Sequence, residues 1–236
     1  MTLRNALQNA LSICGALVFS LSIHSAVAAS YTVPSASMEP TLMIGDHIGV
    51  VIPQYGFSTA NLPFGNLLHS PEGGNSRLFG HMPSRGDVIV FRAPASPKDT
   101  WVKRVIGLPG DRIELRGGRV LINGTMLPWK DEGTFREESS KGIWQTAEQY
   151  DETLPGNHHH KILKMQENGQ LDDIAPFTVP SGRLFVMGDN RDNSADSRVP
   201  VSDGGVGLLP LWNVTGRAIE VLWSWHHPTR VIISLA

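Results

Sequence analysis

Short runs of apolar and β-branched residues, each bounded by glycine, proline or other turn residues, recur through the body of the chain. Such runs are typical of β-strands. Residues 112–123 contain two of them around Gly117-Gly118, which predicts a hairpin turning at this pair. No long stretch after residue 30 has the spacing of an amphipathic helix. The chain is therefore predicted to be mainly β, with antiparallel strands near residues 47–52, 87–91, 101–106, 183–187 and 217–225.

Composition suggests that one part of the chain is inserted into another. Residues 128–181 are more polar than their surroundings. Together with the preceding hairpin, they are interpreted as a smaller β-rich domain, residues 112–181. This domain interrupts an antiparallel β-sheet core made of residues 30–111 and 182–236. The 24 glycines and 16 prolines of the 236-residue chain favour many short strands joined by turns.

The first 29 residues are almost all apolar or small. Arg4 is the only Lys, Arg, Asp or Glu before Ser30, and the apolar stretch 11–23 is followed by Ala26-Val27-Ala28. This pattern predicts an N-terminal apolar helix, either a retained signal-anchor with its N-terminus in the cytoplasm or a removable signal peptide. Both place everything after residue 30 outside the cytoplasm. A buried helix of a soluble protein is the third interpretation.

Charge and cysteine content exclude several classes of function. With 20 Lys+Arg against 22 Asp+Glu, the net charge is −2 and provides no basic surface for nucleic acid. The single cysteine, Cys14, excludes a disulfide within the chain and a multi-cysteine metal site. The run His158-His159-His160 could bind a metal, but a solvated loop is the better interpretation. Neither a metal nor a cofactor is expected.

Lys103 lies within the predicted strand 101–106. Side chains alternate between the faces of a strand, so Lys103 shares its face with Trp101 and Val105, while Arg104 points to the other face. If Arg104 marks the solvent side, Lys103 is desolvated, and burial lowers a lysine pKa. Alternatively, Lys103 extends its amine to water from the strand edge.

Two loops contain serines that could be functional. In PSASMEPTL, residues 34–42, Pro34 and Pro40 restrict the backbone, and a serine there either caps a turn or is held toward a substrate. Residues 185–198 run from an apolar strand into a turn rich in Gly, Asp and Asn. That turn is a rigid loop presenting Ser194, a calcium loop, or a structural turn with an Asp196–Arg198 ion pair. The EF-hand pattern does not fit, because Arg191 stands where an oxygen ligand is required.

Four motifs occur in a fixed order after the apolar N-terminus: Ser-Ala-Ser-Met-Glu-Pro-Thr-Leu at residues 35–42, Arg-Gly-Asp at 85–87, Lys-Arg-Val-Ile-Gly-Leu-Pro-Gly-Asp at 103–111 and Gly-Asp-Asn-Arg-Asp-Asn-Ser-Ala-Asp-Ser-Arg at 188–198. Together they resemble the motifs of the bacterial type I signal peptidase (leader peptidase) family. The resemblance extends from about residue 31 to residue 225. It implies an antiparallel β-sheet catalytic core of the signal peptidase type.

The resemblance also implies roles for individual residues. Ser37 would be the nucleophile and Lys103 its general base. Ser194 would hydrogen-bond the lysine, and the Ser35 hydroxyl would contribute to the oxyanion hole with the Ser37 backbone N–H. Supporting roles would fall on Met38, Gly188, Asp196 and Arg198.

The chemistry requires such a set. A serine hydroxyl is a weak nucleophile until a base takes its proton, and Ser–Lys pairs are a known solution. At its free pKa of about 10.4, a lysine is neutral in only roughly one molecule in 2,500 at pH 7. An apolar environment around Lys103 would lower that pKa.

The resemblance implies a Ser–Lys endopeptidase, held by one N-terminal span on the outer face of a bacterial plasma membrane. Its partners would be membrane lipid and exported preproteins, whose signal peptides it would remove after small residues at −1 and −3. Ala26-Val27-Ala28 would then allow self-cleavage. Trp101 stands where relatives often have tyrosine, and Trp212, Trp223 and Trp225 suit either a membrane-interface belt or core packing.

Other interpretations remain. A specialised Ser–Lys peptidase that matures a single conjugation or pilin-like protein would share the motifs. A self-cleaving repressor would need a DNA-binding segment, where this chain has an apolar one. A calcium-binding secreted module would keep the Asp-rich loop without needing Ser37 or Lys103.

Overall fold

The computed structural model describes residues 28–56, 58, 80–138 and 144–235. Their regular structure is almost entirely antiparallel β, which confirms the predicted fold class. The described helices are 3-10 turns: η1 (Ala36–Met38), η2 (Pro53–Tyr55), η5 (Val201–Asp203) and η6 (Leu211–Asn213). Residues 1–27, which make up most of the predicted apolar helix 1–29, lie outside the described residues. In the part of the chain that is described, no helix has the length and apolar character needed to cross a bilayer.

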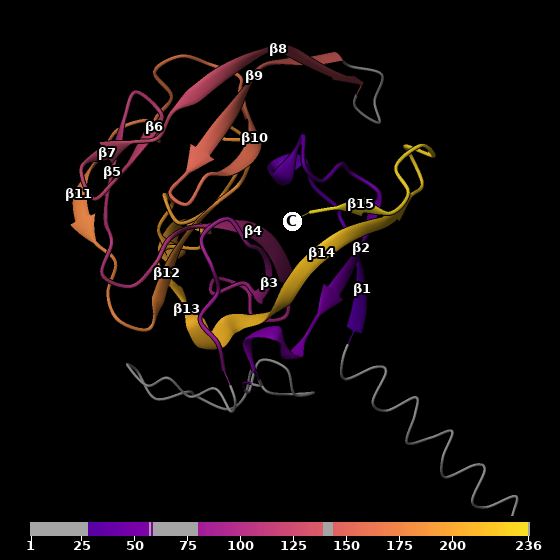
Figure 1. Ribbon diagram of the computed structural model, residues 1–236, viewed down its shortest axis with the longest axis horizontal. Coiled ribbons are helices and arrows are strands. Elements are labelled where there is room, and N and C mark those ends of the chain that lie inside the picture. The colour runs from indigo at the N-terminus through magenta and orange to yellow at the C-terminus, as the bar shows by residue number, and fades with distance from the viewer. Residues whose placement is uncertain (1–27, 57, 59–79, 139–143, 236) are drawn as a thin grey trace, which may run out of the picture.

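The main sheet combines strands from both ends of the chain (Figure 1). Its order is β1 (Ala28–Thr32), β2 (Asp46–Val51), β14 (Val214–Ser224), β3 (Val88–Arg92), β4 (Thr100–Gly107), β12 (Arg183–Met187) and β13 (Leu209–Pro210), and β15 (Ile233–Ser234) pairs with β14. Strand β14 inserts between β2 and β3, so the late part of the chain completes the sheet begun by the early part. Five of these strands match the predicted runs to within three residues at each end.

Two smaller sheets are formed by the residues between β4 and β12. One has the order β11 (Ile174–Thr178), β5 (Arg112–Arg116), β6 (Arg119–Ile122) and β7 (Thr125–Met126). The other has the order β10 (His158–Lys164), β9 (Trp144–Leu154) and β8 (Trp129–Glu138). The predicted hairpin is present as β5–β6, and it turns through Gly117 and Gly118 at φ 53° and 78°, which glycine adopts without strain. These strands all fall within residues 112–181, whose status as a separate domain stays a prediction.

Strand β12 shows why some runs are apolar without alternation. Leu184 and Val186 pack into one hydrophobic cluster, while Phe185 and Met187 point the other way into a second cluster. The second cluster also contains residues of β5, β6 and β9, so it joins the main sheet to the smaller ones. A strand that is buried on both faces reads as a continuous apolar run. Strand β12 is therefore fixed in position from both sides, close to the loop that follows it.

Phe185 allows a test of this packing. Its side chain is 1% exposed and lies in an edge-to-face contact with Phe177, with ring centroids 5.6 Å apart. Phe185→Ala should lower the free energy of unfolding by about 3–5 kcal/mol, because it leaves a cavity between the sheets. Urea denaturation measures this change. The control is Met126→Ala on the 39%-exposed Met126, which should change stability by less than about 0.5 kcal/mol; equal effects of the two substitutions would contradict the packing argument.

Candidate active site

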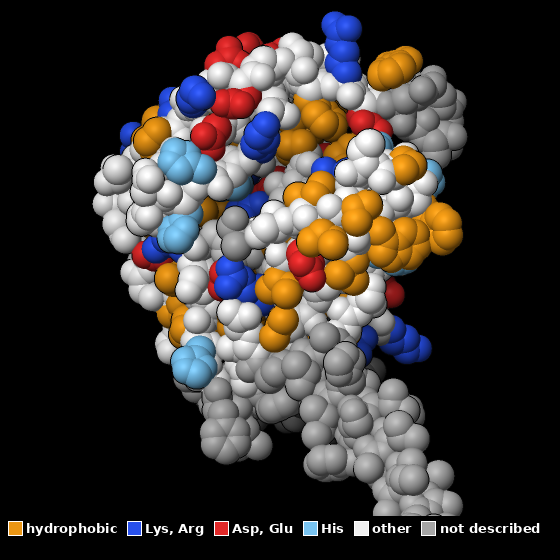
Figure 2. Space-filling model, turned by 45° about the vertical axis from the view of Figure 1, so that its right-hand side comes forward, with side chains coloured by type: hydrophobic (Ala, Val, Ile, Leu, Met, Phe, Trp, Pro, Cys, Tyr) orange, Lys and Arg blue, Asp and Glu red, His pale blue; other side chains and the backbone are white. Residues whose placement is uncertain are grey.

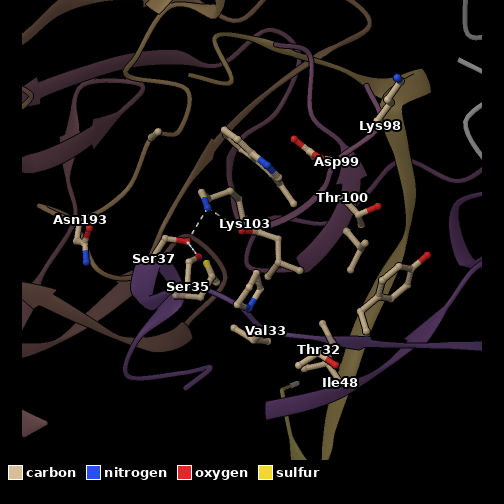
Figure 3. Close-up of a pocket in the computed structure, with 17 residues that line it drawn as sticks. Thr32, Val33, Ser35, Ser37, Ile48, Lys98, Asp99, Thr100, Lys103 and Asn193 are labelled. Atoms are coloured by element: carbon tan, nitrogen blue, oxygen red, sulfur yellow. Dashed lines mark hydrogen bonds between the residues drawn. The ribbon is translucent and has the colours of Figure 1, made fainter. Parts of the chain in front are cut away.

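Ser37 lies in the 3-10 turn η1, shortly before two residues that are buried in the core. Met38 is 1% exposed and packs with Leu42 in a hydrophobic cluster below the turn. The Glu39 N–H donates to the Ala36 carbonyl at 3.1 Å, which closes the turn. The Leu42 N–H donates to the Met38 carbonyl at 2.9 Å. With its neighbour turned inward, Ser37 is half-buried and faces the space above the sheet (Figure 3). The Ser35 side chain makes no capping hydrogen bond to the turn, which holds the Ser37 hydroxyl at the surface of a cavity.

Lys103 points from β4 toward this serine. Its Nζ donates to the Ser37 Oγ at 2.8 Å and to the Val102 carbonyl at 2.9 Å (Figure 3). The residue is 4% exposed, so the buried interpretation holds and the solvent-reaching one is wrong. Trp101 lies on the same side of the strand, and its ring centroid is 5.7 Å from the Lys103 Nζ.

Burial lowers the pKa of Lys103 from 10.5 to about 8, because the charged amine is deprived of water. The carboxylates of Asp196 and Asp189 act in the opposite direction, and the Arg198 guanidinium adds to the lowering. At a pKa of about 8, roughly one molecule in ten has a neutral amine at pH 7. A neutral amine at 2.8 Å is able to accept the proton of the serine hydroxyl.

Arg104 corrects one expectation. Its side chain points away from Lys103, as the alternation predicts, but it does not mark a solvent side, since it is only 5% exposed. The guanidinium donates to both carboxylate oxygens of Asp189 at 2.9 and 2.7 Å and to the Gly86 carbonyl at 2.8 Å. Both faces of β4 are therefore buried here, one around an amine and the other around an ion pair.

The loop after β12, residues 188–198, is called the Ser194 loop. It packs directly against the backbone of Ser37. The Asn190 N–H donates to the Ser37 carbonyl at 3.2 Å. Gly188 has no room for a side chain, because a methyl group there would overlap the Ser37 carbonyl oxygen and the Ser194 Oγ. The Gly188 N–H donates to the Asp196 carboxylate at 2.9 Å. This loop therefore determines where the turn η1 lies relative to β4.

The ion pair expected between Asp196 and Arg198 is present, at 2.9 Å. Burial acts to raise the pKa of Asp196, but the adjacent Arg198 holds it below its usual value, so the carboxylate is ionised. In the described ranges there is no group of three or more His, Cys, Asp or Glu placed to hold a metal ion. Both Asp196 oxygens are occupied by protein donors.

Ser194 and Ser35 differ in their burial and in their contacts. Ser194 is 8% exposed, and its Oγ has no hydrogen-bond partner. The hydrogen bond to Lys103 that the resemblance implies is thus not formed here; the amine donates to the Ser37 Oγ and to the Val102 carbonyl. Ser35 is exposed, with its Oγ 3.4 Å from the Ser37 Oγ (Figure 3).

A cavity of about 590 Å³ opens in front of the serine and the lysine. Strands β1 and β4 form its walls, and the Ser194 loop contributes Asn193 and Ala195 (Figure 3). Met38 and Trp101 lie at its apolar surface. Sequence patterns singled out most of the residues around Ser37, but they did not predict the contacts of Arg104, Asp189 and Asn190, whose partners lie far away in the chain. Their only sequence signal is their place within the motifs.

Comparison with known proteins identifies the family of the chain. Residues 6–223 match the family model described as signal peptidase, peptidase S26. A signal peptidase I of Rickettsia bellii (strain OSU 85-389) is 31% identical over 213 residues, covering 88% of this chain and 69% of that protein. The corresponding protein of Pseudomonas aeruginosa is 36% identical over 203 residues, 84% of this chain and 66% of that one.

Among solved structures, a signal peptidase I from Enterococcus faecalis V583 is 26% identical, with a TM-score of 0.34, and the match covers 58% of this chain and 97% of that chain. The family model covers most of the chain, and the two sequence relatives match over more than four fifths of it. The chain therefore belongs to the signal peptidase family, peptidase S26, and is a serine endopeptidase.

Proposed function

We propose that this endopeptidase uses Ser37 as its nucleophile and Lys103 as its general base. The observation that carries the proposal is the 2.8 Å contact between the Lys103 Nζ and the Ser37 Oγ, made by a lysine that is 4% exposed. An apolar setting and a pKa of about 8 make this lysine a usable base near neutral pH. Nearby histidines are not needed for the assignment.

The reaction follows from this pair. Neutral Lys103 takes the hydroxyl proton as the Ser37 Oγ attacks the scissile carbonyl carbon, and the resulting oxyanion accepts hydrogen bonds from the Ser37 N–H and the Ser35 hydroxyl. The Lys103 ammonium then gives its proton to the leaving amine, and the C–N bond breaks. A water molecule, deprotonated by the same amine, hydrolyses the acyl-enzyme and restores Ser37. Ser194 would accept a hydrogen bond from the ammonium when it forms.

The proposed substrates are exported preproteins, from which the enzyme removes signal peptides after small residues at −1 and −3. The relatives named signal peptidase I support this substrate class. Met38 and Trp101 border the cavity at the serine and limit the size of the side chains it accepts. Maturation of a single conjugation or pilin-like protein is the second candidate, and a panel of preprotein cleavage sites separates the two.

We place the enzyme on the outer face of a bacterial plasma membrane, held by the N-terminal segment as a single span. Figure 2 shows hydrophobic side chains gathered on one face of the molecule. Trp225 and Ile232 are 72% and 74% exposed, and backbone hydrogen bonds link Trp225 to Gly45 and Ile232 to Leu222. The exposed apolar residues near this end of β14 are Ile44, Trp225, Val231 and Ile232. Contact with lipid is the favoured explanation for such a patch.

The other two tryptophans considered for an interface belt, Trp212 and Trp223, are less exposed than Trp225. Trp223 stacks on His47, with ring centroids 3.8 Å apart, and packs edge-on against Trp225. Trp212 is half-buried. Of the three tryptophans considered for an interface belt, Trp225 is thus the one whose exposure supports the role.

Removing the proposed base tests the mechanism and the substrate class together. In detergent, the wild type should cleave a preprotein with an Ala-x-Ala site, and Lys103→Ala should lower kcat by roughly 10²–10⁴-fold, because the hydroxyl loses its proton acceptor. Lys161→Ala, which removes an exposed lysine, should leave the rate unchanged. Undiminished cutting by Lys103→Ala would assign the base to another residue, and absence of cutting by the wild type would favour the specialised substrate.

The pH dependence follows from the lowered pKa. Because the base acts in its neutral form, kcat/KM should rise with pH, reach half of its plateau near pH 8 and fall about tenfold for each pH unit below that. Initial rates between pH 5.5 and 10 measure the profile. Glu39 is also buried, and burial and the nearby Glu137 raise its pKa to about 7. The profile is therefore repeated with Glu39→Gln, and loss of the limb near pH 8 in that variant would assign it to Glu39.

Gly188→Ala tests the contact between the loop and the nucleophile. The added methyl group would overlap the Ser37 carbonyl oxygen and the Ser194 Oγ, so one of these groups must move. A displacement of this kind should lower kcat by about tenfold to a hundredfold. Gly49→Ala is the matched control, since its methyl group would have no neighbour closer than 3.4 Å. A Gly188→Ala enzyme as active as the control would show that the close approach is not needed.

A further inference from the structure

Arg191 in the Ser194 loop is the largest fully buried side chain in the described residues, at 1% exposed. Its guanidinium donates to the two carboxylate oxygens of Glu152, on strand β9, at 3.1 and 2.5 Å. Glu152 is completely buried. A buried ion pair is costly to desolvate, and apolar side chains of similar size often stabilise a fold as well. Stability alone therefore does not explain why a paired charge is buried here.

The Glu152 carboxylate is also contacted by residues of β8 and of β10, the strand that forms a hairpin with β9. The Trp129 Nε1 donates to it at 2.7 Å. His160, directly opposite on β10, approaches it with its Nε2 at 3.3 Å. Burial and the nearby Arg104 lower the pKa of His160, so the ring is neutral. Arg191 is thus the cation that balances this carboxylate.

The same hairpin also holds the backbone of the loop. The Leu163 N–H on β10 donates to the Asp189 carbonyl at 2.9 Å, and the Arg191 N–H donates to the Leu163 carbonyl at 2.9 Å. Between these two bonds, the Asn190 N–H donates to the Ser37 carbonyl at 3.2 Å. Three consecutive loop residues are therefore held between β10 and the turn that carries Ser37.

The hydrogen bonds extend further along the loop. The Arg198 guanidinium donates to the Arg191 carbonyl at 2.6 Å and to the Asp196 carboxylate at 2.9 Å. Asp196 in turn accepts the Gly188 N–H and is one of the carboxylates that act on Lys103. A continuous set of contacts thus joins Glu152 on β9 to the surroundings of Ser37 and Lys103.

We propose that the β9–β10 hairpin is part of the catalytic apparatus and that Glu152 is a positioning residue, which holds the Ser194 loop, and through it Ser37, by its ion pair with Arg191. The link to catalysis rests on the proposed role of Ser37. Glu152 contacts neither the cavity nor the reacting atoms. Its effect is on the distance between Ser37 and Lys103 and on the charges around the lysine.

This role has a consequence for pH that a purely structural role lacks. Without the Glu152 carboxylate, the nearest anionic partners of Arg191 are Asp189 and Asp196, which already act on its guanidinium. Both carboxylates raise the pKa of Lys103, so an Arg191 that turns toward them weakens that effect. The pKa of Lys103 therefore falls, and the acid limb of the pH profile moves to lower pH.

The first test compares Glu152→Gln with Glu148→Gln, the same substitution at an exposed position of the same strand. Glu152→Gln should lower kcat by about tenfold to a hundredfold, with KM changed less than about twofold. The acid limb of its pH profile should lie at lower pH than that of the wild type. Glu148→Gln should match the wild type. The proposal would be overturned by a folded Glu152→Gln enzyme whose kcat and whose pH profile are those of the wild type.

A second measurement does not depend on activity. In a Ser37→Ala background, which keeps the carbonyl that Asn190 contacts, Glu152→Gln should speed amide hydrogen exchange in residues 186–198 relative to residues 112–122. Unchanged exchange there would overturn the proposal even if the Ser–Lys assignment stands. Conversely, Glu152→Gln could speed exchange while Lys103→Ala, tested separately, stays active. That combination would support the positioning role of Glu152 and overturn the assignment of Lys103 as the base.

If Glu152→Gln does not fold, Trp129→Phe serves instead. It removes the hydrogen bond to Glu152 and keeps an aromatic ring against Tyr150, which Trp129 stacks on at 4.9 Å. The changes in kcat, in the pH profile and in amide hydrogen exchange should be in the same direction as for Glu152→Gln but smaller. A folded Trp129→Phe enzyme without any of these changes would overturn the proposal.

Discussion

The structure depends on keeping one lysine amine away from water while holding it 2.8 Å from a serine hydroxyl. Lowering the pKa of Lys103 from 10.5 to about 8 costs the folded state on the order of 3 kcal/mol wherever the amine would otherwise be charged. A lysine at a strand edge would avoid this cost by reaching solvent. Strand β4 is interior to the main sheet, and Lys103 is only 4% exposed although it borders the cavity.

The charges near Lys103 are arranged to keep this pKa low. Asp189 and Asp196 would favour the ammonium, but each is paired with an arginine, Arg104 and Arg198 respectively. The positive charge of each arginine opposes the field of its carboxylate partner and limits the attraction of that carboxylate for the amine. Burial consequently remains the dominant influence on Lys103. The same ion pairs anchor β4 and the Ser194 loop, so electrostatics and geometry are set by the same side chains.

Sequence patterns predicted the fold and the central pair of residues, for identifiable reasons. Continuous apolar runs at β3 and β12 report strands covered on both faces, and the ordered motifs placed Ser37 and Lys103. Alternation assigned Arg104 to the opposite face correctly, but it carried no information on whether that face meets solvent. The partnership of Glu152 with Arg191 joins residues 39 positions apart, and no local pattern marks either as a partner of the other. Polar strands such as β8 lack the apolar signal altogether.

The contacts that hold Ser37 are largely made by backbone atoms. The Ser37 carbonyl is bonded by the Asn190 amide, and the loop on either side of Asn190 is bonded by the amide and carbonyl of Leu163. Such bonds do not depend on side-chain identity, so residues between the motifs can differ widely without moving the serine. Side chains matter where the loop must be drawn to the hairpin, at Arg191 and Glu152, and where bulk is excluded, at Gly188. This division is compatible with relatives only 31–36% identical that match over most of the chain.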